Sequence, residues 1–411
     1  MNKNLNKQES PKIYQIETRK EDYVSPTTFV PKKVVSITGG IAESIVTSTE
    51  RILNKEAPFL KKGVVKAIGE NQYNAWEMVS DEGGKGHLQT APNPLTYYAA
   101  GSASSLLTQV ERGIKILGLD VNNVKVESEI FFRWDNPFTY NWSGYTDKVV
   151  SSIIVDSKES PEKIKELKEL AIKSWAVGEG LANETIIDAA TVINGEDNWK
   201  GHQAKPGRVG SPISIDEGCE ITNITGDVKL ETFPLKEDLS LEMHKLPQSF
   251  TFSEVVTVES VHDAKKPYMH KIQAKSLTEN YQTWEFYSDD SCGDERIGKV
   301  PTSWDYFTLG TSFCLMSQLT ANQMYFKQKG VNIEDFRVEH QFNYTKENFM
   351  TPSMAGNLKN VITRIVVKSN AKKEDINSFA TQSLKCCFAG EGIQNKTEME
   401  SDIYLNGKII K

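Results

Sequence analysis

The chain has few of the residues from which the commonest chemical sites are built. Its 411 residues include 5 cysteines and 6 histidines. No His-Glu-x-x-His or Cys-x-x-Cys spacing occurs, so the sequence predicts no metal site. No Gly-x-Gly-x-x-Gly or other phosphate-cradling loop occurs either, and we expect no cofactor. A small, odd number of cysteines excludes a disulfide scaffold and favours free thiols in a reducing compartment.

Excess positive charge and long apolar runs are also lacking. The 48 basic residues are outnumbered by 55 acidic ones, which gives a net charge of −7. Because phosphate binding needs clustered positive charge, we expect no nucleic-acid partner. No run approaches the roughly 18 apolar residues of a membrane span, and the polar N-terminus lacks the apolar stretch of a signal peptide. These features predict a cytoplasmic protein with no membrane partner.

What the chain does contain is an internal repeat. Residues 58–71 and 267–280 match in length and share their end residues, and each copy is followed by Trp-Glu and by a Ser-Asp-acidic triplet. A proline-led segment and an apolar helix come next in both copies. The repeat predicts two similar units joined by an insert. The expected boundaries are a polar N-terminal tail at 1–35, repeat one at 36–196, a linker or insert at 197–250 and repeat two at 251–411.

Only the second copy carries cysteines at equivalent positions. Ser105 stands where Cys314 stands, and the pair Ser174-Trp175 stands where Cys386-Cys387 stands. A Gly-Glu-Gly run follows both pairs and aligns Trp175 with Cys387. We expect these two runs to end the second helix of each unit. Cys219 and Cys292 lie in the insert and in a turn, and we interpret them as incidental.

Proline, glycine and apolar periodicity predict the same elements in each unit. The first unit is predicted to have a strand pair, a helix opened by Pro92 and Pro94 that runs to about Leu117 and is closed by Gly118, two strands at 124–134 and 149–156, and a helix after Ser160. The second unit is predicted to repeat this order. Three residues more separate Cys314 from Gly330 than Ser105 from Gly118, so the second long helix is expected to be about one turn longer.

This order of elements resembles the OsmC/Ohr family. The family motif Pro-x-x-Leu-Leu-x-Ala-Ala-x-x-x-Cys is approximated at 94–105 without its thiol and at 303–314 with it. Members of the family fold as intertwined dimers. The resemblance therefore implies an α+β fold in which two OsmC-like repeats form an intramolecular pseudo-dimer, with central long helices packed against wrapping antiparallel sheets.

The resemblance also implies the chemistry. Cys314 would be the peroxidatic thiol, Cys387 or its neighbour Cys386 the resolving thiol, and an organic hydroperoxide the substrate. A thiolate is the reactive form of cysteine, so Cys314 needs a cation or a hydrogen-bond donor beside it. The sulfenic acid that forms then needs a second thiol within disulfide reach. A small organic substrate and a thiol reductant are the partners expected.

The chain departs from the family at two charged positions. Peroxidase members carry an Arg in the first hairpin and a Glu just after the motif proline. The hairpins here carry Glu-Asn in both copies, and the Glu position holds Leu95 in one copy and Trp304 in the other. Asp305 is a candidate to replace the acid. Arg296 and His87 are candidates to supply the missing cation or donor.

Two other functions remain open. Cys314 could serve as the covalent nucleophile of a non-redox enzyme acting on a small organic substrate. Alternatively, the chain is a pseudoenzyme that binds a small molecule in the pocket between the units. The residues expected to line the substrate site are Trp304, Asp305, Ser105, Trp175, His87 and Glu391, and Glu391 is also a candidate proton acceptor. Further oligomerisation is compatible with the sequence.

Overall fold

The computed structural model describes residues 18–20, 40–52, 57–68, 75–83, 89–137, 139, 141–194, 196–198, 249–261, 268–277, 283–291 and 300–411. Across these residues the chain forms six helices and two multi-stranded sheets, which confirms the predicted α+β class. His87, Arg296, Cys219 and Cys292 lie outside the described residues. So do most of the predicted tail and nearly all of the predicted insert.

The same order of elements occurs twice along the chain, after a short strand β1 (Thr18–Lys20). The first half contains β2 (Ile41–Arg51), β3 (Lys61–Ile68), β4 (Ala75–Ser80), α1 (Pro94–Leu117), β5 (Val121–Asp135), β6 (Ser143–Ser157), α2 (Pro161–Ser174), α3 (Ala176–Ala182), β7 (Ile186–Ile193) and β8 (Glu196–Asn198). The second half contains β9 (Ser249–Ser260), β10 (Met269–Ser276), β11 (Thr283–Asp289), α4 (Ser303–Gln328), β12 (Ile333–Glu347), β13 (Ala355–Ser369), α5 (Lys373–Cys386), α6 (Phe388–Gln394), β14 (Glu398–Leu405) and β15 (Lys408–Ile410).

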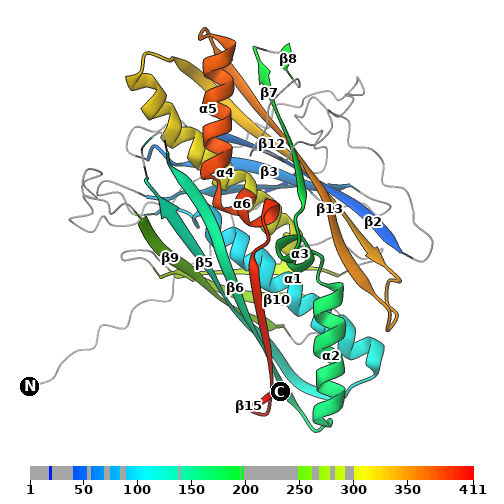
Figure 1. The fold of residues 1–411 in the computed structure, drawn as a ribbon. Coiled ribbons are helices and arrows are strands. Elements are labelled where there is room, and N and C mark those ends of the chain that lie inside the picture. Colours follow the sequence, from blue (N-terminus) through cyan, green and yellow to red (C-terminus); the bar gives the residue numbers. More distant parts are fainter. Residues whose placement is uncertain are drawn as a thin grey trace, which may run out of the picture.

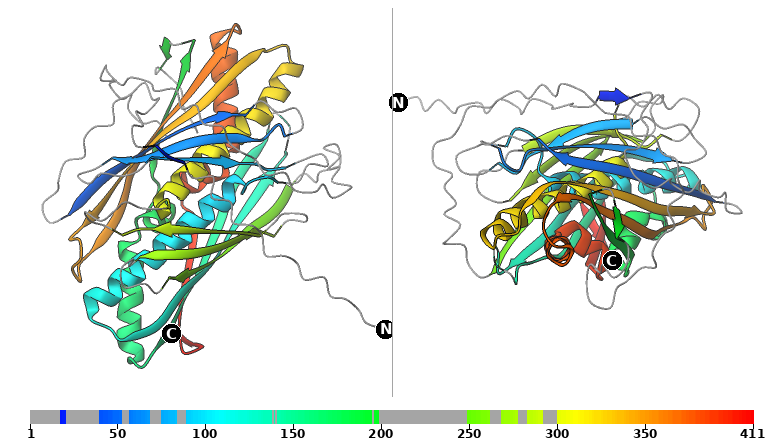
Figure 2. Two further views of the ribbon diagram at one scale, coloured as in Figure 1. Left: turned by 180° about the vertical axis from the view of Figure 1, so that it is seen from behind. Right: turned by 90° about the horizontal axis from the view of Figure 1, so that it is seen from above.

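Each sheet takes strands from both halves. One sheet has the order β1-β4-β3-β2-β12-β13-β7-β8, and the other has the order β11-β10-β9-β5-β6-β14-β15. The halves meet through the antiparallel pairs β2–β12 and β5–β9 and through the parallel pairs β7–β13 and β14–β6. In Figure 2 the blue strands of the first half therefore lie beside the orange strands of the second. Neither half completes a sheet alone.

The two long helices lie between the sheets (Figure 1). α4 packs on β2, β3 and β12 of one sheet, α1 packs on β5, β9 and β10 of the other, and the helices pack on each other. Both helices are buried along most of their length, so small residues are needed where they cross. A Cβ on Gly101 would lie 2.3 Å from the Phe307 nitrogen, and one on Gly310 would lie 2.5 Å from the Tyr98 nitrogen. The backbones touch at these two glycines.

Capping residues set the ends of the long helices as the sequence predicts. Asn93 caps α1 by accepting a hydrogen bond from the Thr96 amide, and Gly118 ends it with φ 61°. Gly330, with φ 80°, follows α4. The predicted extra turn in α4 is wrong: α4 has 26 residues and α1 has 24. Two of the three additional residues lengthen the helix, and the third lengthens the loop before β12.

Within the parts of the chain that the structure describes, no helix has both the length and the apolar character that a membrane crossing requires.

The backbone contact between α1 and α4 can be tested by adding a methyl group at one of the two glycines. Gly101→Ala places a Cβ against the α4 backbone, which cannot rotate away, so we expect a loss of about 1–3 kcal/mol in unfolding free energy. Gly113→Ala in the same helix is the matched control, because its closest neighbour is the end of the Leu167 side chain at 2.6 Å. The measurement is the guanidinium midpoint. Equal midpoints for the two variants would contradict the crossing.

Candidate functional site

Three free, buried cysteines lie where α4 meets the junction of α5 and α6. Cys314 is on α4, and the thiol of Cys387 lies close enough to raise its pKa. The helical conformation is interrupted at Cys387, between α5 and α6. Cys387 is the N-cap residue of α6 and accepts a hydrogen bond from the Gly390 amide at 3.3 Å. This break brings the thiol of Cys387 to α4.

Cys386 has different neighbours from Cys387. Its Sγ donates to the Trp142 carbonyl at 3.3 Å and accepts from Gln382 Nε2 at 3.3 Å, and it packs in a small cluster with Trp142 and Ala321. Burial raises the pKa of the Cys386 thiol to about 12. Cys386 therefore packs against Trp142, and Cys387 is the neighbour that contacts Cys314.

The surroundings of Cys314 favour its neutral thiol form. Burial, followed by the hydrogen bond with Cys387, raises its pKa well above the ordinary value, and a backbone hydrogen bond with Ala389 opposes the rise. The Glu82 carboxylate raises the pKa further. Lys61 is 1% exposed, but its Nζ lies 3.2 Å from the carboxylate of Glu82 and donates to Ser317 Oγ at 2.6 Å. The nearby positive charge is thus paired with a carboxylate.

An aromatic cluster adjoins Cys387. The ring of Phe388, the next residue, lies 5.9 Å from Phe132, 5.5 Å from Trp134 and 5.4 Å from Phe252 between centroids. Trp134 and Phe252 come from β5 and β9 and are partly exposed, whereas Phe132 and Phe388 are buried. Apolar side chains therefore connect the residue beside the thiol pair with the protein surface.

The equivalent place in the first half holds no thiol. Trp175 lies at the break between α2 and α3, as Cys387 lies between α5 and α6. Its Nε1 donates to Ser105 Oγ at 2.8 Å, and Ser105 Oγ donates to the Ser102 carbonyl at 2.7 Å. Ser105 and Trp175 are both 2% exposed. The indole fills the space beside the serine.

The Gly-Glu-Gly runs do not end the second helices, so that prediction is wrong. They lie inside the short helices α3 and α6, after the break. After each break, the central glutamate of the run binds a strand of the opposite half: Glu179 accepts from the Leu358 amide at 2.8 Å, and Glu391 accepts from the Thr146 amide at 2.8 Å. Glu391 therefore acts as a structural acceptor beside Cys387.

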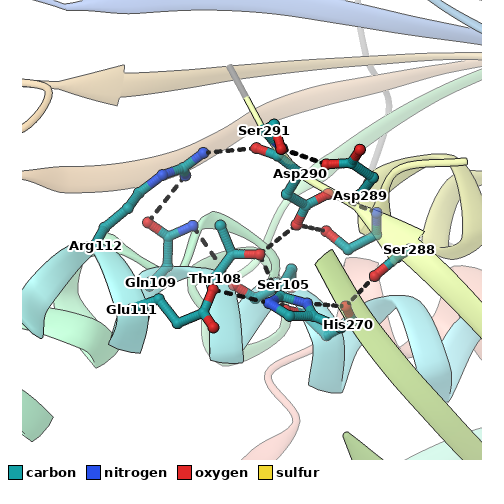
Figure 3. Close-up of polar contacts among 12 residues, drawn as sticks. Ser105, Thr108, Gln109, Glu111, Arg112, His270, Ser288, Asp289, Asp290 and Ser291 are labelled. Carbon is teal, nitrogen blue, oxygen red and sulfur yellow. Dashed lines mark hydrogen bonds and ion pairs between the residues drawn. The ribbon is translucent and has the colours of Figure 1, made fainter. Parts of the chain in front are cut away.

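A buried polar network lies next to Ser105 (Figure 3). His270 of β10 has Nδ1 2.8 Å from Ser104 Oγ and Nε2 3.1 Å from Glu111 Oε2. Ser104 Oγ also lies 2.6 Å from Ser288 Oγ. The order Ser104–His270–Glu111 is that of a hydrolytic triad, but neither Ser104 nor His270 has exposed surface. The network fastens α1 to strands of the second half.

Trp304 and Asp305 lie at the start of α4, about 15 Å along the helix from Cys314. Asp305 forms a capping box with Thr302, whose amide donates to Asp305 Oδ2 at 2.8 Å. Trp304 stacks on Tyr344 with centroids 4.1 Å apart and lines a cavity of about 20 Å³, room for about one water molecule. Neither residue is brought to the thiol pair.

A larger groove of about 340 Å³ lies outside Trp175. It is formed by the α2–α3 junction, the start of β13 and the middle of β14, so both halves contribute to it. Lys173, Glu179, Asn357 and Ser401 are its polar members, and Met399 and the indole of Trp175 are among its apolar ones.

Comparisons with known proteins give one structural likeness. No family model and no curated protein matches the chain. A solved structure of an OsmC-like hydroperoxide resistance protein from Jannaschia sp. CCS1 is similar over 34% of this chain and 88% of that chain, with 15% identity and a TM-score of 0.25. Among the described residues, no group of three or more His, Cys, Asp or Glu side chains is placed to hold a metal ion.

Sequence reasoning missed three residues near the thiols: Tyr98, Lys61 and Glu82. Burial, followed by Cys314, Cys387 and Glu391, raises the pKa of Tyr98 well above its ordinary value. The signal for Tyr98 was present, because the two motif copies align it with Phe307. Lys61 and Glu82 carried no such signal, since only the fold brings β3 and the end of β4 to α4.

The raised pKa of Cys314 predicts how its reactivity depends on pH. Only the thiolate reacts, so alkylation of Cys314 by iodoacetamide should increase by about tenfold for each pH unit through pH 9, without levelling off near neutrality. Peptide mass mapping separates Cys314 from the other cysteines, and Cys314→Ser identifies its peptide. A plateau of the Cys314 rate between pH 6 and 8 would show a depressed pKa and contradict the structure.

Proposed function

We propose that the chain is a pseudo-dimer of two OsmC-like units, at 36–196 and 251–411, with one thiol site at their seam. Three observations support this: the repeated element order, the exchange of strands between halves, and the crossing of α1 and α4 at equivalent glycines. The thiol pair lies in the second half, and Ser105 and Trp175 occupy the equivalent place in the first.

We propose that the site performs thiol redox chemistry and reduces an organic hydroperoxide. The observation that carries the proposal is the presence of two free, buried thiols, Cys314 and Cys387, near enough to interact electrostatically at a helix break. The Cys314 thiolate attacks the terminal peroxide oxygen, so that an S–O bond forms as the O–O bond breaks. Cys387 then displaces the hydroxyl from the sulfenic acid and forms a disulfide, which an external dithiol reduces.

The aromatic cluster beside Cys387 supports an apolar substrate. Phe388, Phe252 and Trp134 offer rings but no charge, so they favour an alkyl or aryl hydroperoxide over hydrogen peroxide.

The redox proposal predicts which sulfurs become linked. One equivalent of cumene hydroperoxide should convert the reduced protein to a Cys314–Cys387 disulfide, seen as one linked peptide pair by mass mapping. Cys386→Ser is the matched control and should form the same link, because Cys386 contacts Trp142 instead. Cys314→Ser and Cys387→Ser should abolish it. An oxidant that leaves both thiols unchanged in the wild-type chain would remove the redox function and favour the non-redox alternative.

A second candidate function, binding of a small amphipathic molecule, is favoured by the groove outside Trp175. Its volume of about 340 Å³ falls in the range of ligand pockets, and Lys173 at its rim suits an anionic head group.

Filling the groove should reduce binding if this candidate is correct. With 8-anilinonaphthalene-1-sulfonate as the probe, Ser401→Leu should weaken the wild-type affinity by at least tenfold. Asp402→Leu, on the exposed side of the same strand, is the control and should leave the affinity unchanged. The fluorescence of the bound probe reports the binding. Equal affinities in the two variants would exclude the groove.

A further inference from the structure

The hydroxyl of Tyr98 is an unexplained polar group in the core. Tyr98 has no exposed surface, and its Oη has no hydrogen-bond partner in the described part of the chain. A buried hydroxyl without a partner costs about 1–3 kcal/mol compared with a satisfied one. Such groups are rare in folded proteins and require an explanation. One of the known explanations is a catalytic role.

The position of this hydroxyl relates it to the thiol pair. Tyr98 is on α1, directly at the crossing, where its backbone contacts Gly310. Its Oη would lie 3.0 Å from a Cβ on Gly392, in the short helix that begins after Cys387. After burial, the groups that raise its pKa are Cys314, Cys387 and Glu391. The phenol therefore stays protonated at neutral pH, and the charges that act on it are those of the thiol site.

The other half provides an internal comparison. Phe307 occupies the position in α4 that Tyr98 occupies in α1, and the two rings stack with centroids 4.7 Å apart. The position thus accepts either ring. The hydroxyl is present on Tyr98, beside the short helix that follows Cys387, and absent from its counterpart in the other helix.

We propose that Tyr98 is a catalytic residue of the thiol site, contributed by the first half. Its hydroxyl, unpaired while Cys314 is a neutral thiol, donates a hydrogen bond to the Cys314 thiolate once that forms and then to the departing peroxide oxygen. This inference rests on the redox function proposed above. It supplies the donor that a reactive thiolate requires, in a site whose nearby cation, Lys61, is paired with Glu82.

With this role for Tyr98, every proton in the reaction has a donor and an acceptor. When the Cys314 thiolate takes the terminal hydroxyl of the hydroperoxide, sulfur is oxidised by two electrons and the O–O bond is reduced to an alkoxide. Tyr98 protonates the alkoxide, giving an alcohol and a phenolate. The phenolate takes the proton of Cys387, and the new thiolate attacks the sulfenic sulfur, releasing hydroxide and forming the disulfide.

The test compares Tyr98→Phe with Tyr306→Phe in the full chain. Tyr306 occupies the position of Tyr97 in α4 and donates to the Tyr287 carbonyl at 2.7 Å, so its variant also loses one buried hydroxyl. With cumene hydroperoxide under single-turnover conditions, Tyr98→Phe should slow oxidation of Cys314 by at least tenfold at pH 7.5. It should also move the pH profile of Cys314 alkylation to higher pH. Tyr306→Phe should change neither.

The outcomes separate this role from the proposed function. If the wild-type thiols are not oxidised, the redox function fails. If the wild-type chain is oxidised and Tyr98→Phe matches it in rate and pH profile, only the role of Tyr98 fails. If Tyr98→Phe does not fold, 3-fluorotyrosine at position 98 keeps the ring and lowers the phenol pKa. An unchanged pH profile in that protein overturns the proposal, and a shift to lower pH supports it.

Discussion

Backbone contact between α1 and α4 at Gly101 and Gly310 fixes the geometry on which the rest of the structure depends. It sets the distance between the two sheets, since each helix packs on one of them. It also places the backbone of Tyr98, from the first half, against Gly310, one helical turn before Cys314. A side chain at either glycine would separate the helices, and the residues on both sides would move with them.

The two halves share an architecture but differ in the chemistry at equivalent positions. One position pairs Cys314 with Cys387, and the other pairs Ser105 with Trp175 through an indole hydrogen bond. The polar groups that surround Ser105, from His270 to Asp290, bind one another and lock the helix to the sheet (Figure 3). The polar network thus joins the two halves, whereas the two thiols lie together in the second half.

The sequence predicted much of the fold because the repeat and the helix caps are local signals. Pro94 and Gly118 marked the ends of α1. Alignment of the two repeat copies identified Cys314 as the equivalent of Ser105. The strands β2 and β9 were not anticipated, because nothing in residues 41–51 announces a partner strand, β12, some 300 residues away. The breaks at Trp175 and Cys387 were also missed, and the contacts of Glu179 and Glu391 with the opposite half that follow them are visible only in the fold. Whether Cys386 or Cys387 faces α4 depends on that break.

We propose that Cys314 and Cys387 form one redox couple inside a single chain. The most direct measurement is a redox titration against dithiothreitol, with every cysteine followed by mass mapping and the chain's size by gel filtration. We expect one two-electron transition that is confined to these two sulfurs and leaves the oligomeric state of the chain unchanged. A transition that involves Cys386, links separate chains, or leaves Cys314 reduced would contradict it.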